Sequence, residues 1–188
     1  MKLQLLVAGV GGQGILFITR LLETAALARG QSVIGAETHG MSQRGGSVAS
    51  HFKLGDYHSP MVRRGTADCL IAMDASEAYR NLAFLRPGGL VFVNARDGQF
   101  PKPEIQEALI RCGIQVFSID ADALAMSLGA PNLANVALLG LAVSHPDFPF
   151  DDQEVRQAIG AISPVRYYEL NLKALSEGQR GAKEAGSR

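Results

Sequence analysis

Six residues near the amino terminus, Gly9-Val10-Gly11-Gly12-Gln13-Gly14, have the G-x-G-x-x-G spacing of loops that bind phosphate groups. Glycines at these positions let the backbone turn sharply and approach a ligand, and free N–H groups at the start of a following helix attract an anion. The spacing therefore predicts an anion site, with a dinucleotide as one candidate. The alternative is that the glycines serve only a tight turn, in which Gln13 offers its amide to the loop or to a neighbouring chain.

A second segment, Thr38 to Gly46, mixes many hydrogen-bond donors with three glycines. Loops of this composition ordinarily lie at the carboxyl ends of strands in α/β proteins, where ligands bind. Arg44 has a planar fork of donors that suits a phosphate or a carboxylate, or that caps carbonyl groups of its own loop. Glu37 stands where dinucleotide-binding enzymes keep the acid that binds the ribose, or it is a surface residue at a strand end.

The other reactive residue types form no recognisable catalytic or metal-binding pattern. The four histidines show neither HxxxH nor HExxH spacing, so a metal site is not expected. Cys69 and Cys112 lie in or beside apolar stretches, where we expect buried thiols, and two cysteines cannot supply the four thiolates of an ordinary iron–sulfur cluster. Asp74 follows an expected strand and precedes an expected helix, so we expect it to cap that helix.

The glycine motif is expected to lie between a strand and a helix. Leu3 to Ala8 is apolar, and Ile15 to Ala26 has apolar residues at helical spacing, with Gly30 ending the helix. Strands are then expected from Val33 to Glu37 and from Gly46 to Leu54. No helix separates these two strands, which departs from a strict mononucleotide-binding repeat and weakens the dinucleotide interpretation.

The rest of the chain continues to alternate between strands and helices. Arg86-Pro87-Gly88-Gly89 is expected to be a turn, and residues 178–188 a frayed tail. Further strands are expected at 68–73, 90–93 and 115–119, and helices at 76–85, 104–111, 132–143, 151–162 and 165 to about 178. We therefore expect one Rossmann-like α/β domain over residues 1–188, with a mainly parallel sheet, helices on both faces and a helical C-terminal third.

Composition limits the partners of this domain. A chain of 188 residues that is 47% hydrophobic is long enough to bury one core without disulfides or metals. Its 18 basic and 18 acidic residues give no positive field, so neither nucleic acid nor an anionic membrane is an expected partner. The first residues do not form a secretory signal and no apolar run reaches membrane-spanning length, so we expect a cytoplasmic protein.

Both glycine-rich motifs together resemble a known family. Gly-Val-Gly-Gly-Gln-Gly-Ile at 9–15 and Thr-His-Gly-Met-Ser-Gln-Arg-Gly-Gly at 38–46 are similar to the gamma-type domain of the pyruvate and 2-ketoisovalerate:ferredoxin oxidoreductases. The second motif resembles the indolepyruvate-oxidising branch of that family. Segments 86–90, 135–140 and 171–178 agree, so the resemblance spans nearly the whole chain.

The resemblance implies a subunit that completes an enzyme. In this family a large subunit carries thiamine diphosphate and iron–sulfur clusters, decarboxylates the 2-oxoacid and passes electrons to ferredoxin. The gamma-type domain packs against it and, in coenzyme A-dependent members, helps to form the coenzyme A site, so this chain alone is expected to hold no cofactor and to be inactive. The candidate cofactor-binding residues are Gly9, Gly11, Gly12, Gln13, Gly14, Thr38, His39, Gly40, Ser42, Gln43, Arg44, Gly45 and Asn135.

One departure from the family's motif bears on the substrate. Relatives that act on pyruvate or ketoisovalerate tend to carry Tyr-Gly-Pro-Glu where this chain has His39-Gly40-Met41-Ser42, which favours aryl pyruvates as substrates. Two alternatives to a subunit remain. One is a free-standing NAD-binding reductase that uses the glycine turn and Glu37, and the other is a regulatory nucleotide-binding module, in which the segment 38–46 would have no obvious task. Binding of NAD to the isolated chain would distinguish the reductase from the subunit.

Overall fold

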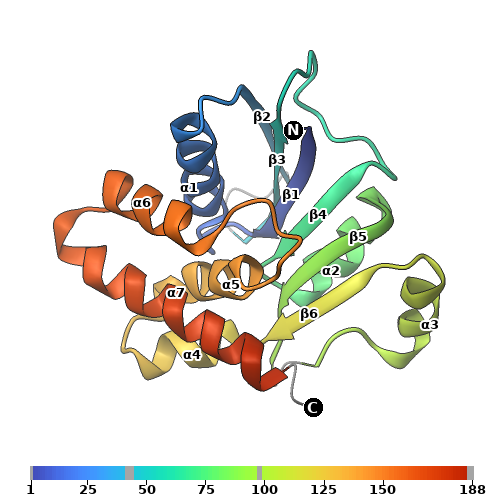
Figure 1. Ribbon diagram of the computed structural model, residues 1–188. Helices are drawn as coiled ribbons and strands as arrows, with labels where there is room; N and C mark the ends of the chain where they lie inside the picture. The colour runs from blue at the N-terminus through green and yellow to red at the C-terminus, as the bar shows by residue number, and fades with distance from the viewer. Residues whose placement is uncertain (1, 41–44, 97–98, 186–188) are drawn as a thin grey trace.

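A single six-stranded sheet organises the protein. The computed structural model describes residues 2–40, 45–96 and 99–185. The strand order is β2-β3-β1-β4-β5-β6, and β3 is antiparallel to both of its neighbours, whereas β1, β4, β5 and β6 are parallel (Figure 1). The expectation of a mainly parallel α/β sheet is confirmed. The strands are β1 (Leu3–Val10), β2 (Val33–His39), β3 (Ser47–Leu54), β4 (Ala67–Ala72), β5 (Leu85–Asn94) and β6 (Gln115–Ile119).

The central strand β1 is buried on both faces. Leu5 and Val7 belong to the core cluster on one face, and Leu6 and Ala8 belong to the cluster on the other. A strand covered on both sides has no polar face, which explains why it reads as a continuous apolar run rather than as an alternating one.

Helices cover both faces of the sheet, as expected. One face is packed by α1, α4, α5, α6 and α7, and the other by α2, while α3 joins β5 to β6 (Figure 1). The helices are α1 (Ile15–Ala28), α2 (Ala75–Asn81), α3 (Pro103–Arg111), α4 (Ala121–Ser127), α5 (Ala134–Val143), α6 (Asp152–Ile162) and α7 (Val165–Ala185), with short 3-10 turns at Leu82–Phe84 and Pro131–Leu133. The C-terminal third is helical, again as expected.

The prediction that α7 ends near Gly178 and frays beyond it was wrong, because the helix continues to Ala185. Gly178 lies inside the helix, where a β-carbon would overlap the carbonyl oxygen of Ala137 on α5. Likewise, a β-carbon on Gly140 of α5 would overlap the carbonyl oxygen of Leu175 on α7. These two glycines bring the backbones of α5 and α7 together, so Gly178 serves helix packing and not helix termination.

Three further expectations need correction. The expected turn at 86–89 lies inside β5, where a register shift against β4 accommodates it: Ala67 pairs with Leu85 but Cys69 with Leu90. Helix α4, which the side chain of Asp120 caps at Ala123 N, was not predicted. The expectation that both thiols are buried holds for Cys69 but not for Cys112, which is exposed. Burial raises the pKa of the Cys69 thiol well above its usual range.

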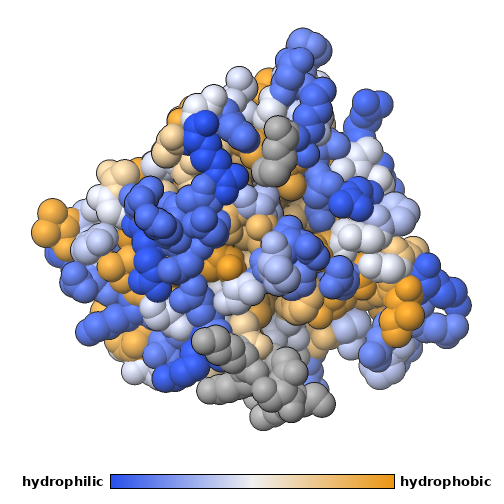
Figure 2. All heavy atoms as spheres, in the orientation of Figure 1, coloured by the Kyte–Doolittle hydropathy of each residue, from blue (hydrophilic) through white to orange (hydrophobic). Residues whose placement is uncertain are grey.

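The surface mixes polar and apolar side chains. Figure 2 shows hydrophilic residues over most of the viewed face, with apolar spheres gathered at the right in the region of α3. Ile110 of α3 has 67% of its surface exposed. No helix within the described residues has the length and apolar character needed to cross a membrane.

Candidate functional site

The glycine turn connects the carboxyl end of β1 to the start of α1. Gly14 caps α1 in the left-handed region at φ 75°, and no acidic residue occupies the first turn of the helix. Within the described part of the chain, the N–H groups of Gly12, Gly14, Ile15 and Leu16 have no backbone acceptor. Such free N–H groups, together with the helix dipole, make the start of a helix suitable for an anion.

Gly9 and Gln13 maintain the turn from inside. A β-carbon on Gly9 would lie 2.7 Å from Gln13 Oε1 and 2.9 Å from Met73 Cβ, so only glycine fits there. The Gln13 amide accepts a hydrogen bond from Val10 N at 2.7 Å and donates one to Met73 O at 3.3 Å. Both halves of the Gln13 amide are therefore engaged within this chain, which is the structural alternative raised by the sequence.

Asn135 braces the turn from α5. Its side chain is buried, its Nδ2 donates to Gly14 O at 3.1 Å, and its Oδ1 accepts from Val136 N at 2.8 Å. A β-carbon on Gly14 would overlap this amide. The structure thus brings Asn135, a candidate cofactor-binding residue, to the glycine motif, where its side chain supports the turn.

The second motif begins at the end of β2 and returns at the start of β3. Gly11 N donates to Gly46 O at 2.9 Å, and Gly40 N donates to Ser47 O at 2.7 Å, so both ends of the segment are fixed beside the glycine turn. Thr38 Oγ1 donates to Ala49 O at 3.2 Å across the two strands. Gly45 adopts φ 73° and is exposed. The candidates Ser42, Gln43 and Arg44 lie outside the described residues.

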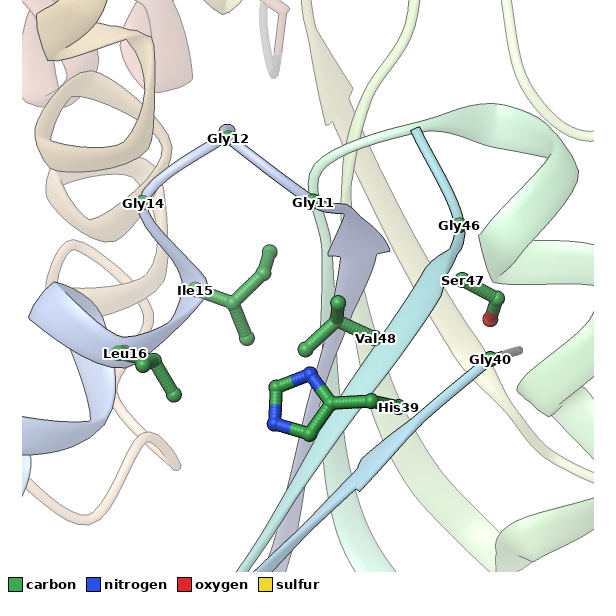
Figure 3. A pocket seen from close by; sticks show the side chains of 10 residues that line it. All are labelled: Gly11, Gly12, Gly14, Ile15, Leu16, His39, Gly40, Gly46, Ser47 and Val48. Carbon is green, nitrogen blue, oxygen red and sulfur yellow. The ribbon is translucent and has the colours of Figure 1, made fainter. Parts of the chain in front are cut away.

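A pocket of about 360 Å³ lies between the two motifs. In Figure 3 the glycine turn runs along one side, and the side chains of Ile15, His39 and Val48 are directed into the space between α1 and the strands. The lining residues are Gly11, Gly12, Gly14, Ile15, Leu16, His39, Gly40, Gly46, Ser47 and Val48. Backbone donors on one side and apolar side chains on the other suit a ligand that has both an anionic and an organic part.

Sequence reasoning did not identify a buried carboxylate behind this pocket. Ser47 Oγ donates to Glu77 Oε2 at 2.6 Å, and Arg80 Nη1 donates to Glu77 Oε1 at 2.7 Å. Glu77 is only 2% exposed and lies in the first turn of α2, which Asp74 caps through Ser76 N and Glu77 N as expected. The position of Ser47 directly after the glycine-rich motif is the signal that could have indicated this contact.

Glu37 is not placed as in a dinucleotide-binding fold. There the ribose-binding acid ends the strand that lies next to β1. Here β3 lies between β1 and β2, and Glu37 pairs with Ser50 of β3 and lies 3.4 Å from His39 Nε2 through its Oε2. Glu37 does not line the pocket between the two motifs. The geometry therefore gives no support to the reductase alternative.

The comparisons with known proteins agree with the motifs. The family model described as pyruvate ferredoxin/flavodoxin oxidoreductase matches residues 4–180, which is nearly the whole chain. This chain belongs to that family. Among the described residues of this family member, no three or more histidine, cysteine, aspartate or glutamate side chains form a group that could hold a metal ion.

Individual members of the family match along their full length. Indolepyruvate oxidoreductase subunit IorB from Archaeoglobus fulgidus is 36% identical over 193 residues, which cover 97% of this chain and 96% of that protein. The gamma subunit of a keto/oxoacid ferredoxin oxidoreductase from Geobacter sulfurreducens has the same fold, with a TM-score of 0.76, 22% identity and coverage of 97% and 99%.

A larger oxidoreductase contains the fold as one part. The 2-oxoglutarate:ferredoxin oxidoreductase from Magnetococcus marinus, solved with 2-oxoglutarate, coenzyme A and succinyl-CoA bound, matches with a TM-score of 0.76 and 20% identity. The match covers 97% of this chain but 31% of that one. The fold of this family member is therefore found both as a separate subunit and as a region of a longer chain.

Proposed function

We propose that this chain is the small subunit of a coenzyme A-dependent 2-oxoacid:ferredoxin oxidoreductase that acts on indolepyruvate or another aryl pyruvate. The observation that carries the proposal is the pocket lined by the glycine turn and by residues 39–40 and 46–48, in a chain that belongs to this family. The full-length similarity to an archaeal indolepyruvate oxidoreductase subunit and the sequence His39-Gly40-Met41-Ser42 support the aryl substrate.

In the proposed reaction the bond between the carbonyl and carboxylate carbons of the 2-oxoacid breaks and carbon dioxide leaves. The acyl group forms a thioester with coenzyme A, the thiol proton is released, and two electrons pass to ferredoxin. Thiamine diphosphate and iron–sulfur clusters on a large partner subunit supply the decarboxylation and the electron transfer. The task of this chain is to bind and orient coenzyme A at the junction of the two subunits.

The candidate residues fall into two groups: those that would contact the ligand in the pocket, and those that hold the glycine turn in shape. The N–H groups of Gly12, Gly14, Ile15 and Leu16, which have no backbone acceptor among the described residues, are suited to a phosphate of coenzyme A. His39 and the apolar wall of the pocket are suited to its organic part. In this proposal Gly9, Gln13 and Asn135 act by holding the turn, because their side chains or close contacts face the protein interior.

A substrate panel on the assembled complex tests the proposal. Indolepyruvate, phenylpyruvate, pyruvate and 2-ketoisovalerate are compared by viologen reduction, each with and without coenzyme A. We expect kcat/KM for the two aryl substrates to exceed that for the two small substrates by at least about tenfold, which corresponds to roughly 1.4 kcal/mol of transition-state binding. Higher kcat/KM for pyruvate, or full activity without coenzyme A, would contradict the proposal.

A further inference from the structure

A second hollow lies at the opposite, amino-terminal edge of the sheet. It has a volume of about 440 Å³, and its walls include Gln4 at the start of β1, Lys53 of β3, and Arg63 and Thr66 in the segment before β4. Because a strand rises about 3.3 Å per residue, Gln4 and Gly11 are roughly 20 Å apart. This hollow, which we call the amino-edge hollow, is separate from the pocket at the glycine turn.

Lys53 gives the amino-edge hollow its most unusual feature, a lysine whose side chain is largely covered by the protein. The residue is 5% exposed, and its Nζ lies 5.0 Å from the centroid of the Tyr57 ring, which also lines the hollow. Over residues 2–40, 45–96 and 99–185, no carboxylate forms an ion pair with Lys53. Burial, followed by the charge of Arg63, lowers the pKa of Lys53. A bound anion would offset both effects.

Two further cations lie in the same region: Lys2 beside the Tyr57 ring and Arg63 in the wall of the hollow. Lys2 Nζ lies 5.3 Å from the Tyr57 centroid, and Arg63 lines the hollow without an ion pair to any described residue. The acid that influences Tyr57, Asp68, is already engaged, because it accepts from Arg86 Nε at 2.6 Å and from the backbone N of Gln4 at 2.8 Å. The positive charge of the hollow is therefore not neutralised by Asp68.

The floor of the hollow is fixed by contacts within the protein. Gln4 Nε2 donates to Thr66 O at 3.1 Å, and Thr66 Oγ1 contacts Gln4 Oε1 at 3.3 Å and Arg63 O at 2.8 Å. These bonds join the start of β1 to the segment that carries Arg63. A ligand would meet a floor that is already formed, so little of its binding free energy would be spent on ordering.

We propose that the amino-edge hollow binds a phosphate dianion, either free or carried by a small organic molecule. The two cations that line the hollow, Lys53 and Arg63, match a dianion better than a single carboxylate, and the guanidinium fork can pair with two phosphate oxygens. The rings and aliphatic atoms of Tyr57 and Met61 provide a wall for an organic group. The volume, far above the roughly 30 Å³ of a water molecule, accommodates one.

Chemical-shift titration of the full ¹⁵N-labelled chain tests this proposal, because it reports both affinity and location. Inorganic phosphate, adenosine monophosphate and acetate are added at constant ionic strength. We expect phosphate to shift the amides of residues 53–66 with a Kd of about 1 mM or tighter, and acetate to bind at least tenfold more weakly. If adenosine monophosphate binds more tightly than inorganic phosphate, the ligand of the hollow is an organic phosphate. If it binds equally or more weakly, the ligand is the free phosphate ion.

Variants separate this site from the glycine turn. Lys53→Met keeps an apolar side chain of similar length and should weaken phosphate binding at least tenfold. Arg63→Gln should do the same, and because Arg63 is exposed this replacement should leave the fold intact. Leu16→Glu at the glycine turn and Lys173→Gln on the surface of α7 should leave phosphate binding at residues 53–66 unchanged. The proposal is overturned if phosphate does not shift residues 53–66, if acetate binds equally well, or if folded Arg63→Gln retains wild-type affinity.

Discussion

The side-chain amide of Asn135 donates to the carbonyl oxygen of Gly14 at 3.1 Å and joins two residues that are 121 positions apart. Gly14 caps α1 in the left-handed region, so this single hydrogen bond ties the cap of one helix to the first turn of the buried helix α5. The shape of the anion-suited turn thus depends on a residue that does not line the pocket.

Asn135→Ala should destabilise the isolated chain by about 1–3 kcal/mol, because Gly14 O and Val136 N both lose their side-chain partner. Urea unfolding followed by circular dichroism measures the change. Asn132→Ala, at an exposed position three residues earlier, is the matched control and should alter stability by less than about 0.5 kcal/mol. Equal effects of the two substitutions would show that the contact with Gly14 contributes nothing.

Gly178→Ala should destabilise the protein by about 1–3 kcal/mol or more, because the added β-carbon would overlap the carbonyl of Ala137 and force α5 and α7 apart. Gly160→Ala on α6 is the control, since its β-carbon would meet only Tyr168 Cε2 at 3.5 Å, an ordinary contact. That substitution should stabilise the protein by up to about 1 kcal/mol through helix propensity. Thermal unfolding should therefore show shifts of opposite sign, and two shifts of the same sign would contradict the close crossing.

The same glycine shows what the sequence could and could not predict. The strand, turn and helix around Gly9 to Gly14 were predicted correctly because local signals, an apolar run and helical spacing, determine them. Gly178 was misread as a helix end because its role is set by contact with Ala137, far away in the chain. The local pattern does not distinguish a glycine that ends a helix from one that lets two helices touch.

The sequence also did not predict which strands lie next to each other in the sheet, because strand order depends on contacts between distant parts of the chain. The sequence predicted no helix between β2 and β3, which departs from the nucleotide-binding repeat, and the described residues between these strands contain none. In the observed strand order, β3 lies beside β1 and so separates Glu37 from the glycine turn. The sequence did not predict this order. In the candidate site, the grouping of the two motifs was anticipated, but the Ser47–Glu77 contact and the inward role of Asn135 were not.

A partly exposed ion pair between α1 and α6 should make stability depend on pH. Arg29 pairs with Glu154, and this hydrogen bond is the main cause that lowers the pKa of the Glu154 carboxyl. The contribution of this ion pair to the free energy of unfolding is therefore fully present above the unfolded-state pKa of about 4.3. It is lost as the pH falls through the lower folded-state pKa.

Glu154→Gln keeps an acceptor for Asp151 N but removes the charge. Wild type should exceed this variant by about 1 kcal/mol in free energy of unfolding at pH 7, and the difference should shrink as pH falls below about 4. Urea unfolding at several pH values measures it. Glu107→Gln, in an exposed pair with Arg111, should show a smaller difference at every pH, and a Glu154→Gln difference independent of pH would refute the assignment.

Leu16→Glu tests the anion-suited turn by adding a negative charge to a helix start that has none. Leu16 lines the pocket and is 37% exposed, so the fold should tolerate the change, and an acid there is favourable for the helix. In the assembled complex the KM for coenzyme A should rise at least about tenfold, a cost of roughly 1.4 kcal/mol. Leu16→Gln has the same shape without the charge and should differ little from wild type. If both variants bind coenzyme A equally well, the phosphate does not lie at this turn.

The most direct test of the central claim is a titration of this chain into a fixed amount of the large partner subunit that we propose, the one expected to carry thiamine diphosphate and iron–sulfur clusters. Viologen reduction is measured with indolepyruvate and coenzyme A present. We predict no activity from this chain alone, and a rate that rises with added chain and levels off at a fixed molar ratio of the two subunits. Viologen reduction by this chain alone, or a rate from the large subunit that does not change as this chain is added, would contradict the proposal that the chain completes the enzyme.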